Sequence, residues 1–477
     1  MGLRTAEEFK AGLRDGRIVY FRGELVDDVT THPDIGVVAE HVALDFQLAE
    51  DPKLRELFTY QNDSGKQASR FFKRPNSSDD LLKRSEMIET STRLGSGVVL
   101  LIKEIGTDAL FALSVIAAQV DEERGTDYAE RVNAFHRQCE ARDVAMAVAQ
   151  TDAKGDRSLS PSEQMHPDYY VRVVERRDDG IIVRGAKAHT TNTPVVDEII
   201  VLPTRALGEA DASYAVSFAV PVNAEGVRLV ASPFGGTSDS HFENPVSSRH
   251  RMVETLTIFD DVFVPWERVF LCDEWEFAGP LALAFVDFHR FTAVSYKPPL
   301  CDLLIGAASL IADYNGISNA SHVREKLFNL INYAQTVRAL TRAAAHESRL
   351  FGDTGLVVPD PITTNVCKYY FATNYHQMVK DVQDIAGGLI VTGPGEEDLE
   401  NAEIREDIER FFGGKDVGGG ERLRIMNLIR DLCASDFGAY HEVLAIHAEG
   451  SLEAQKITIA RGFDLARCRG LAVEAVS

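Results

Sequence analysis

Cysteine is scarce in this sequence of 477 residues, and the six cysteines lie far apart from one another. They are Cys139, Cys272, Cys301, Cys367, Cys433 and Cys468. No two of them form the closely spaced pair that a zinc site or a redox motif requires. The spacing argues against disulfide and zinc frameworks, and we expect reduced, buried thiols.

Positively charged residues are also few relative to negatively charged ones. The chain has 50 Lys and Arg residues and 73 Asp and Glu residues, so its net charge is −23. Without a basic stripe to neutralise phosphates, nucleic acid is not expected as a partner. No uncharged apolar run approaches the ~18–20 residues that a bilayer requires. Acidic residues stand where a signal peptide would carry its apolar segment, so we expect a cytoplasmic protein without membrane contact.

Several common catalytic motifs are missing. Gly95-Ser-Gly97 has Leu100 at the position of the third glycine of a dinucleotide-binding fingerprint. Gly414-Lys415 continues with Asp416 instead of Ser or Thr, which excludes a P-loop. Neither H-E-x-x-H nor G-x-S-x-G occurs, so zinc-dependent and serine hydrolase chemistry have no support.

Hydrophobic periodicity divides the chain into three domains. Residues 1–147 and 278–477 have the helical period, whereas residues 148–277 have the alternation of strands. A capping box at Thr5 and Glu8 is expected to start the first helix. The sequence thus predicts an α+β protein, with an N-terminal helical domain, a central antiparallel β-barrel domain and a C-terminal helical bundle.

The same patterns predict individual elements. Residues 108–120 are apolar nearly all round, which is typical of a helix buried on several sides. Asp178-Asp179-Gly180 predicts the turn of a β-hairpin. Further strands are expected at residues 198–202, 214–220, 227–230 and 254–259, and C-terminal helices at residues 280–314, 321–350, 362–387, 397–411, 420–435 and 437–475. We expect the glycine pair 387–388 to end a helix and glycines 418–420 to form a short loop.

Segments from both ends and the middle of the chain carry a resemblance to a known family. They are residues 23–33, 150–158 (Gln-Thr-Asp-Ala-Lys-Gly-Asp-Arg-Ser), 161–164, 184–191, 259–267 and 383–388. In this order they resemble the 4-hydroxyphenylacetate 3-monooxygenase and 4-hydroxybutyryl-CoA dehydratase family of flavoproteins. The order of the three domains is that of the acyl-CoA dehydrogenase-like architecture, which implies a flavin between the β domain and the bundle.

Residues 150–158 are suited to hold FAD. Thr151 and Ser158 can donate hydrogen bonds to the carbonyl oxygens of the flavin ring. Lys154 and Arg157 can offset the pyrophosphate charge, and Gly155 permits close approach of the backbone. Without the resemblance, the same residues would be read as a polar loop between a helix and a strand.

The resemblance implies two more parts of the flavin site. One follows a strand in the β domain, and the other, at residues 383–388, reaches the flavin of a neighbouring subunit, which implies a homotetramer or at least a dimer. A glycine pair is a common helix C-cap as well. The expected cofactor-binding residues are Gln150, Thr151, Lys154, Gly155, Arg157, Ser158, Lys187, His189, Thr190, Gln383, Asp384, Gly387 and Gly388.

The sequence departs from both branches of this family. By resemblance, the iron–sulfur ligand positions of the dehydratase branch are Leu100, Glu104, His289 and Tyr296. Only the histidine is retained, so no iron–sulfur cluster and no other metal is expected. The catalytic tyrosine of that branch corresponds to Ala293. The phenol-binding Arg, Tyr and His of the hydroxylase branch fall near Ile105, Ala109 and Val148, so neither known substrate follows from the sequence.

The predicted catalytic residues are His289, Lys297 and Glu254, which persist, and Tyr296, which stands at the position of a lost ligand. His289, Tyr296 and Lys297 share one helical face, provided that Pro298-Pro299 does not end the helix earlier. His289 would act as a base or bind a phenolate, Tyr296 would donate a hydrogen bond and Lys297 would hold a developing anion. Glu254, from the β domain, is the candidate base for an α-proton. The competing interpretation is a core histidine and a surface lysine.

These features predict a two-component monooxygenase. Reduced FAD from a separate flavin reductase would react with O₂, and a flavin C4a-hydroperoxide would hydroxylate an aromatic or phenolic small molecule. The alternative is a cluster-free FAD-dependent acyl-CoA dehydratase or isomerase with Glu254 as base. A third hypothesis is a flavin-binding scaffold without catalysis.

Overall fold

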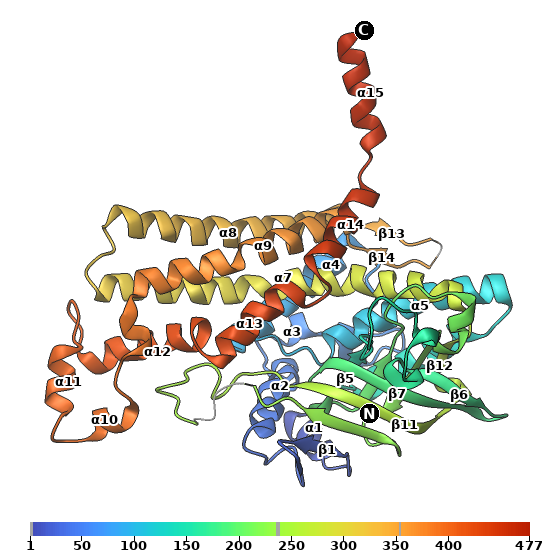
Figure 1. Ribbon diagram of the computed structural model, residues 1–477, viewed down its shortest axis with the longest axis horizontal. Helices are drawn as coiled ribbons and strands as arrows, with labels where there is room; N and C mark the ends of the chain where they lie inside the picture. Colours follow the sequence, from blue (N-terminus) through green and yellow to red (C-terminus); the bar gives the residue numbers. More distant parts are fainter. Residues whose placement is uncertain (1–2, 235–238, 353) are drawn as a thin grey trace.

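The N-terminal region is mainly helical. The computed structural model describes residues 3–234, 239–352 and 354–477 (Figure 1). The helices before the β region are α1 (Ala6–Gly12), α2 (Ile35–Glu50), α3 (Arg55–Phe58), α4 (Ser78–Leu94), α5 (Glu104–Arg124) and α6 (Tyr128–Arg142). The predicted capping box starts α1, since the Thr5 hydroxyl accepts from the Glu8 N–H at 3.1 Å and the Glu8 carboxylate from the Thr5 N–H at 2.9 Å. Helix α5 is buried on nearly every side, as predicted.

The β region forms two main sheets. Its strands are β5 (Met146–Ala149), β6 (Arg172–Arg176), β7 (Gly180–Thr191), β8 (Glu198–Val201), β9 (Val216–Pro221), β10 (Val227–Ala231), β11 (Glu254–Pro265) and β12 (Val269–Cys272). The predicted hairpin is confirmed, because β6 and β7 pair antiparallel with Val173 opposite Val183. The strand orders are β2-β1-β10-β11-β7-β6 and β12-β9-β8-β5. Among the described residues neither sheet closes on itself, so the predicted barrel is not confirmed.

The larger sheet includes strands from the N-terminal region, which the sequence analysis treated as helical. They are β1 (Val19–Phe21) and β2 (Glu24–Leu25), and a separate hairpin contains β3 (Thr59–Gln61) and β4 (Gln67–Ser69). Strand β1 pairs parallel with β10, and β5 pairs parallel with β8. Strands of two or three residues are too short for an alternating pattern to be recognised. The sheets are therefore mixed rather than purely antiparallel.

The C-terminal part is a helical bundle, as predicted. Its elements are α7 (Ala278–Tyr314), α8 (Ser321–His346), β13 (Arg349–Leu350), β14 (Val357–Val358), α9 (Pro361–Ala386), α10 (Glu396–Glu400), α11 (Arg405–Phe411), α12 (Gly419–Cys433), α13 (Asp436–His447), α14 (Leu452–Gly462) and α15 (Leu465–Val476). Helix α7 continues through Pro298 and Pro299. The Val294 carbonyl, which loses its helical partner at Pro298, accepts instead from the Thr341 hydroxyl of α8 at 3.2 Å.

Three predicted features of the bundle need correction. The expected helix at 397–411 is divided into α10 and α11, and the expected helix at 437–475 is divided into α13, α14 and α15. The first break in the latter lies at Glu449 and Gly450, whose φ angles are +55° and +98°. Helix α12 begins at Gly419, so the glycines 418–420 are a helix start rather than a loop. Helix α9 ends before Gly387, as predicted.

The layers meet along α7. Helices α7, α8 and α9 lie side by side, and α4 and α5 pack against α7 on the side nearer the sheets (Figure 1). Helix α13 also lies where the bundle meets the rest of the chain, and α15 projects away from the body (Figure 1). Five cysteines are buried, Cys468 is half-buried, and all six are unpaired. No helix in the described ranges is long and apolar enough to cross a membrane.

Candidate active site

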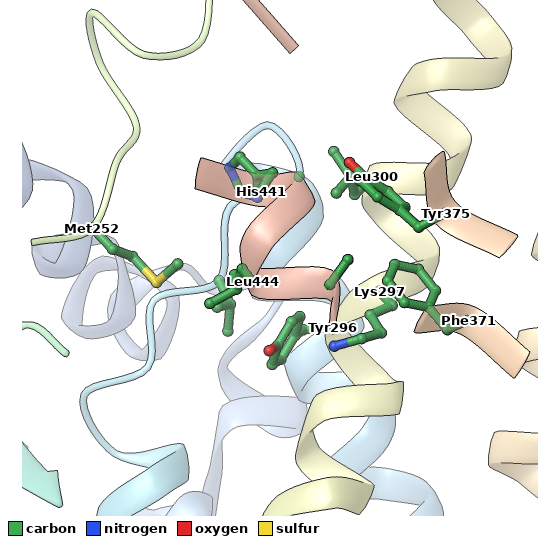
Figure 2. A pocket seen from close by; sticks show the side chains of 11 residues that line it. Met252, Tyr296, Lys297, Leu300, Phe371, Tyr375, His441 and Leu444 are labelled. Atoms are coloured by element: carbon green, nitrogen blue, oxygen red, sulfur yellow. The ribbon is translucent and has the colours of Figure 1, made fainter. Parts of the chain in front are cut away.

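A small cavity lies where α7, α9 and α13 meet the loop before α5 (Figure 2). Its volume is about 20 Å³, which is room for about one water molecule. The lining residues are Gly97, Val99, Met252, Tyr296, Lys297, Leu300, Phe371, Tyr375, His441, Leu444 and Ala445. Two predicted catalytic residues, Tyr296 and Lys297, are among them, and any organic substrate requires lining side chains to move.

Glu449 is the carboxylate that these two residues share. The Tyr296 hydroxyl donates a hydrogen bond to Oε1 of Glu449. Oε2 lies 3.7 Å from Nζ of Lys297 and 3.3 Å from Nζ of Lys368 on α9. Burial opposes ionisation of Glu449, but Lys297, Lys368 and His289 together outweigh it and lower the pKa of the carboxyl to about 2. Burial lowers the pKa of Lys297 to about 8, although Glu449 acts in the opposite direction.

A second carboxyl, that of the half-buried Glu254, starts strand β11 beside this cluster. The Tyr440 hydroxyl donates a hydrogen bond to it at 2.6 Å and the Thr191 hydroxyl donates another at 3.0 Å. Burial raises the pKa of Glu254 to about 7, because the two hydrogen bonds offset only part of the cost of burying a charge. Burial and then the negative charge of Glu254 raise the pKa of Tyr440, and Tyr296 and Glu449 add to it. The two carboxyls thus act on the same tyrosines.

His289 extends the cluster along α7. Its Nδ1 lies 3.1 Å from Oδ2 of Asp108, a fully buried carboxylate on α5. Oδ1 of Asp108 accepts from Nη2 of Arg84 at 2.7 Å and from the Thr292 hydroxyl at 3.0 Å. The imidazole stacks on Phe285 with ring centroids 5.1 Å apart. The imidazole is thereby fixed on two sides, and all four predicted catalytic residues lie around one junction.

The predicted flavin loop lies on the sheet side of the chain. Arg157 and Ser158 are exposed, Lys154 is half-buried, and the Ser158 hydroxyl donates to Asp156 at 2.7 Å. A Cβ at Gly155 would lie 2.3 Å from the ring of Tyr169. Packing within the chain therefore already requires glycine at this position.

Lys187, another residue of the predicted flavin set, has three partners inside the chain. Its Nζ donates to the carbonyl oxygens of Gln150 and Leu202 at 2.9 and 2.8 Å, and lies 2.9 Å from Asp152. The Thr151 carbonyl is equally engaged, by the N–H of Ala188 at 2.8 Å. The ammonium group of Lys187 holds the start of the loop instead of projecting from it.

The end of β7 and the end of α9 hold the remaining residues of the predicted flavin set. His189 is exposed with a φ of +56°, and the buried Thr190 hydroxyl has no hydrogen-bond partner among the described residues. Gln383 donates to the Cys433 carbonyl at 2.6 Å, and Asp384 pairs with Lys326 at 2.8 Å. The exposed Gly387 and Gly388 follow α9, at the end of the bundle away from β5 and β7 (Figure 1). Within one chain the two parts of the predicted site lie apart.

The residues present fit a flavin and do not fit an iron–sulfur cluster. An unpartnered buried hydroxyl at Thr190, next to an exposed loop with basic side chains, suits a polar, anionic cofactor. Of the four expected cluster positions, Leu100 offers only an apolar side chain. The Glu104 carboxylate accepts from the backbone N–H groups of Ile102 and Lys103 at 3.1 and 3.2 Å, and Tyr296 is bonded to Glu449.

The sequence analysis missed four residues of this cluster. They are Asp108, Lys368, Tyr440 and Glu449. Three of them lie inside helices with no motif around them, and only the packing of distant helices brings them together. Glu449 had a local signal, because Gly450-Ser451 combines a residue suited to positive φ with an N-cap residue that starts α14.

A cluster of buried titratable side chains, at the junction of a β module and a helical bundle, is typical of an enzyme active site. The chain belongs to the 4-hydroxyphenylacetate 3-hydroxylase family. Residues 5–271 match the model of the 4-hydroxyphenylacetate 3-hydroxylase N terminal part, and residues 278–476 match that of the C terminal part. The resemblance inferred from the sequence is thus confirmed.

Relatives of two kinds are similar to the chain. It is 34% identical over 475 residues to the 4-hydroxybutyryl-CoA dehydratase/vinylacetyl-CoA-Delta-isomerase of Clostridium aminobutyricum, with 96% of both covered. An oxygen-tolerant archaeal 4-hydroxybutyryl-CoA dehydratase from N. maritimus superposes with a TM-score of 0.94 at 31% identity, covering 99% of this chain and 95% of that chain. The oxygenase component of 4-hydroxyphenylacetate 3-monooxygenase, complexed with FAD and 4-hydroxyphenylacetate, gives a TM-score of 0.91 at 28% identity, with 99% of both chains covered.

Proposed function

We propose that this protein is a flavin enzyme that shifts a proton along the acyl group of a small coenzyme A thioester, converting a β,γ-unsaturated acyl group into its α,β-unsaturated isomer. The observation that carries this proposal is a pair of carboxyls in different surroundings at one junction. Glu254 is half-buried and bonded only to hydroxyl groups, which leaves its pKa raised to about 7, whereas Glu449 lies beside Lys297 and Lys368, which lower its pKa to about 2. Environments that separate the pKa values of two carboxyls give them different acid–base roles. The name of the Clostridium relative includes this isomerisation.

The proton transfer follows from the state of each group at neutral pH. Glu254 is close to half ionised, so it can accept the proton from the α-carbon and return it to the γ-carbon. The electron pair left on the α-carbon moves onto the thioester oxygen, where the ammonium group of Lys297 would stabilise the negative charge. Glu449 stays ionised and compensates the buried charges of Lys297 and Lys368. The electron pair then returns as the new double bond forms.

FAD is part of this proposal. Thr151, Ser158 and Thr190 would bind the ring, with Lys154 and Arg157 at the phosphates, while Gln383 to Gly388 of a second copy would complete the site in a homo-oligomer. When bound, the flavin supplies an electron acceptor next to the acyl group. The relative complexed with FAD supports this cofactor.

A two-component monooxygenase acting on a phenol is the second candidate. The aromatic lining of the cavity by Phe371, Tyr375 and Tyr296 and the oxygenase relative favour it. It would require a separate reductase that supplies reduced FAD. Against it, the three positions expected to bind a phenol, Ile105, Ala109 and Val148, are apolar and buried in the core.

The two functions are separated by supplying both kinds of substrate to the FAD-loaded protein. We expect but-3-enoyl-CoA to be converted into but-2-enoyl-CoA without O₂ or an external reductant, as followed by liquid chromatography. Hydroxylated product from a phenol panel with reduced FAD and O₂, and no change in the thioester, would instead establish the monooxygenase. If neither reaction occurs, the third hypothesis remains, a flavin-binding scaffold without catalysis.

A further inference from the structure

Glu449 is held in place by an arginine that does not line the cavity. Arg290 lies on α7, one residue after His289, and is 4% exposed. Its Nε donates a 2.9 Å hydrogen bond to the backbone carbonyl oxygen of Glu449. We propose that Arg290 is a positioning residue that sets the Glu449 carboxylate between Lys297 and Lys368. This inference rests on the charge-compensating role of Glu449 in the proposed function.

The backbone at Glu449 needs such a support. Glu449 and Gly450 both have positive φ angles, and Glu449 is not a glycine, so its own conformation is strained. This strained turn is what directs the Glu449 side chain inward, where it is 2% exposed. A strained conformation persists only when its surroundings hold it, and the hydrogen bond from Arg290 is made to the strained residue itself.

The guanidinium group also fixes the turn to the helices that carry the two lysines. Nη1 of Arg290 donates to Oδ1 of Asn365 on α9 at 2.7 Å and lies 3.4 Å from the Thr458 hydroxyl on α14. Asn365 is itself bonded to the Pro361 carbonyl at 2.7 Å. Because α7 carries Lys297 and α9 carries Lys368, one side chain sets the turn relative to both cations.

Close packing at Gly450 gives a second way to disturb the same contact. A Cβ added at Gly450 would lie 2.8 Å from Nη2 of Arg290, too close for an undisturbed guanidinium group. Gly450→Ala therefore forces the guanidinium group or the turn to shift while leaving the arginine in the chain, and the φ of +98° at Gly450 adds strain for any residue with a Cβ. Arg290→Lys keeps the positive charge and loses the planar group that bonds in two directions. Arg290→Lys thus removes the planar donor group, whereas Gly450→Ala crowds that group from the side of the turn.

The charged and titratable groups around Glu449 come from four elements. They are His289, Tyr296 and Lys297 on α7, Lys368 on α9, Tyr440 on α13 and Glu254 on β11. Both lysines, and with them His289, favour the ionised carboxylate. Withdrawal of Glu449 from the lysines therefore raises its pKa, whether the side chain moves into solvent or stays buried without its partners.

The test observes the protonation of Glu449 directly. Infrared spectra of the full-length protein are recorded across the acidic pH range, and subtraction of Glu449→Gln isolates the band of the protonated Glu449 carboxyl. In the wild type we expect this band only near pH 2, because the two lysines hold the pKa of Glu449 at about 2. In Arg290→Lys and Gly450→Ala we expect it at higher pH, near or above the ordinary carboxyl value of 4.5. The control Arg461→Lys, at an exposed position in the last turn of α14, should titrate like the wild type.

An unchanged titration in both folded variants would overturn the role of Arg290. If Arg290→Lys does not fold, Asn365→Ala, which removes the α9 partner of Nη1, is measured in its place, because Gly450→Ala also strains the turn itself. In thioester turnover we expect both variants to lower kcat about tenfold or more with little change in KM, since a misplaced Glu449 no longer supports the ammonium group of Lys297 that stabilises the developing anion. A wild type without turnover would refute the proposed function, while the infrared result would still decide the role of Arg290.

Discussion

The Tyr440 hydroxyl donates a 2.6 Å hydrogen bond to Oε1 of Glu254, which joins helix α13 to the first residue of strand β11. The contact spans 186 residues of sequence and places a carboxyl from the sheet next to the titratable side chains of the bundle. It also favours the ionised form of Glu254 and so counteracts burial. The pKa of Glu254 therefore depends on Tyr440, a residue of the C-terminal bundle.

Removal of the Tyr440 hydroxyl tests this dependence. In Tyr440→Phe the carboxylate loses a donor, so the pKa of Glu254 should rise above about 7. Because the base must be ionised, the acidic limb of the pH dependence of kcat/KM should move to higher pH. Measurement of the profile with but-3-enoyl-CoA checks this, and Tyr369→Phe on α9 is the matched control. A profile that moves to lower pH would contradict the assignment of Glu254 as base.

Loss of the Glu449 charge should affect Lys297 first. In Glu449→Gln burial acts on Lys297 without its anionic partner, so the pKa of the lysine should fall below about 8. The alkaline limb of the pH profile should then move to lower pH, since the ammonium form is needed. Removing one partner from a buried ion pair also costs about 3–5 kcal/mol of stability, which thermal unfolding detects. The double variant Glu449→Gln, Lys297→Met should recover part of this loss, and strict additivity of the two single effects would argue against the pair.

Asp108 should act through His289. Asp108→Asn keeps the shape of the side chain but removes the charge that Nδ1 of His289 and the guanidinium group of Arg84 share. If His289 takes part in proton transfer, turnover should fall about a hundredfold or more, the range of general acid–base catalysis. FAD affinity, measured by fluorescence titration, should change little. Equal losses in both quantities would indicate that Asp108 only stabilises the fold.

Arg157 and His289 should separate cofactor binding from chemistry. Arg157→Ala removes an exposed cation from the predicted flavin loop and should weaken FAD binding about ten- to hundredfold, as expected for one charge-assisted contact. His289→Ala should impair turnover much more than FAD binding. Both constants are measured on the same preparations, with Arg177→Ala, at an exposed hairpin position, as the control for loss of charge. The reverse order of effects would refute both roles.

Much of the fold could be predicted from the sequence, because most of its elements are long and periodic. Strands β6 and β8 to β10 and helices α7 to α9 agree with the expected segments within a few residues. Strands β7 and β11 extend further than expected, to Thr191 and Pro265, so Lys187, His189 and Thr190 lie within β7 and not after a strand. Strand β1 could not be predicted, since three residues carry no period and its partner β10 lies about 200 residues away. The continuous helix expected at 437–475 was wrong because the turn at Glu449 interrupts it.

The candidate site could be predicted only where its residues share one element. His289, Tyr296 and Lys297 repeat along α7, and their common face is readable from the sequence once the helix is known to pass Pro298. Lys368 and Tyr440 reach the cluster only through tertiary packing, which no local pattern encodes. The flavin assignments for residues 150–158, 187–190 and 383–388 stay predictions.

The most direct test of the central claim is deuterium incorporation into a thioester. The FAD-loaded protein is incubated with but-3-enoyl-CoA in deuterated buffer without O₂, and the product is analysed by NMR and mass spectrometry. We expect but-2-enoyl-CoA, with deuterium at the γ-carbon in the fraction of turnovers in which the proton held by Glu254 exchanges with the buffer before it is returned. Glu254→Gln that still binds FAD should lose both isomerisation and exchange. An unchanged thioester with the wild type, or full activity of Glu254→Gln, would contradict the account.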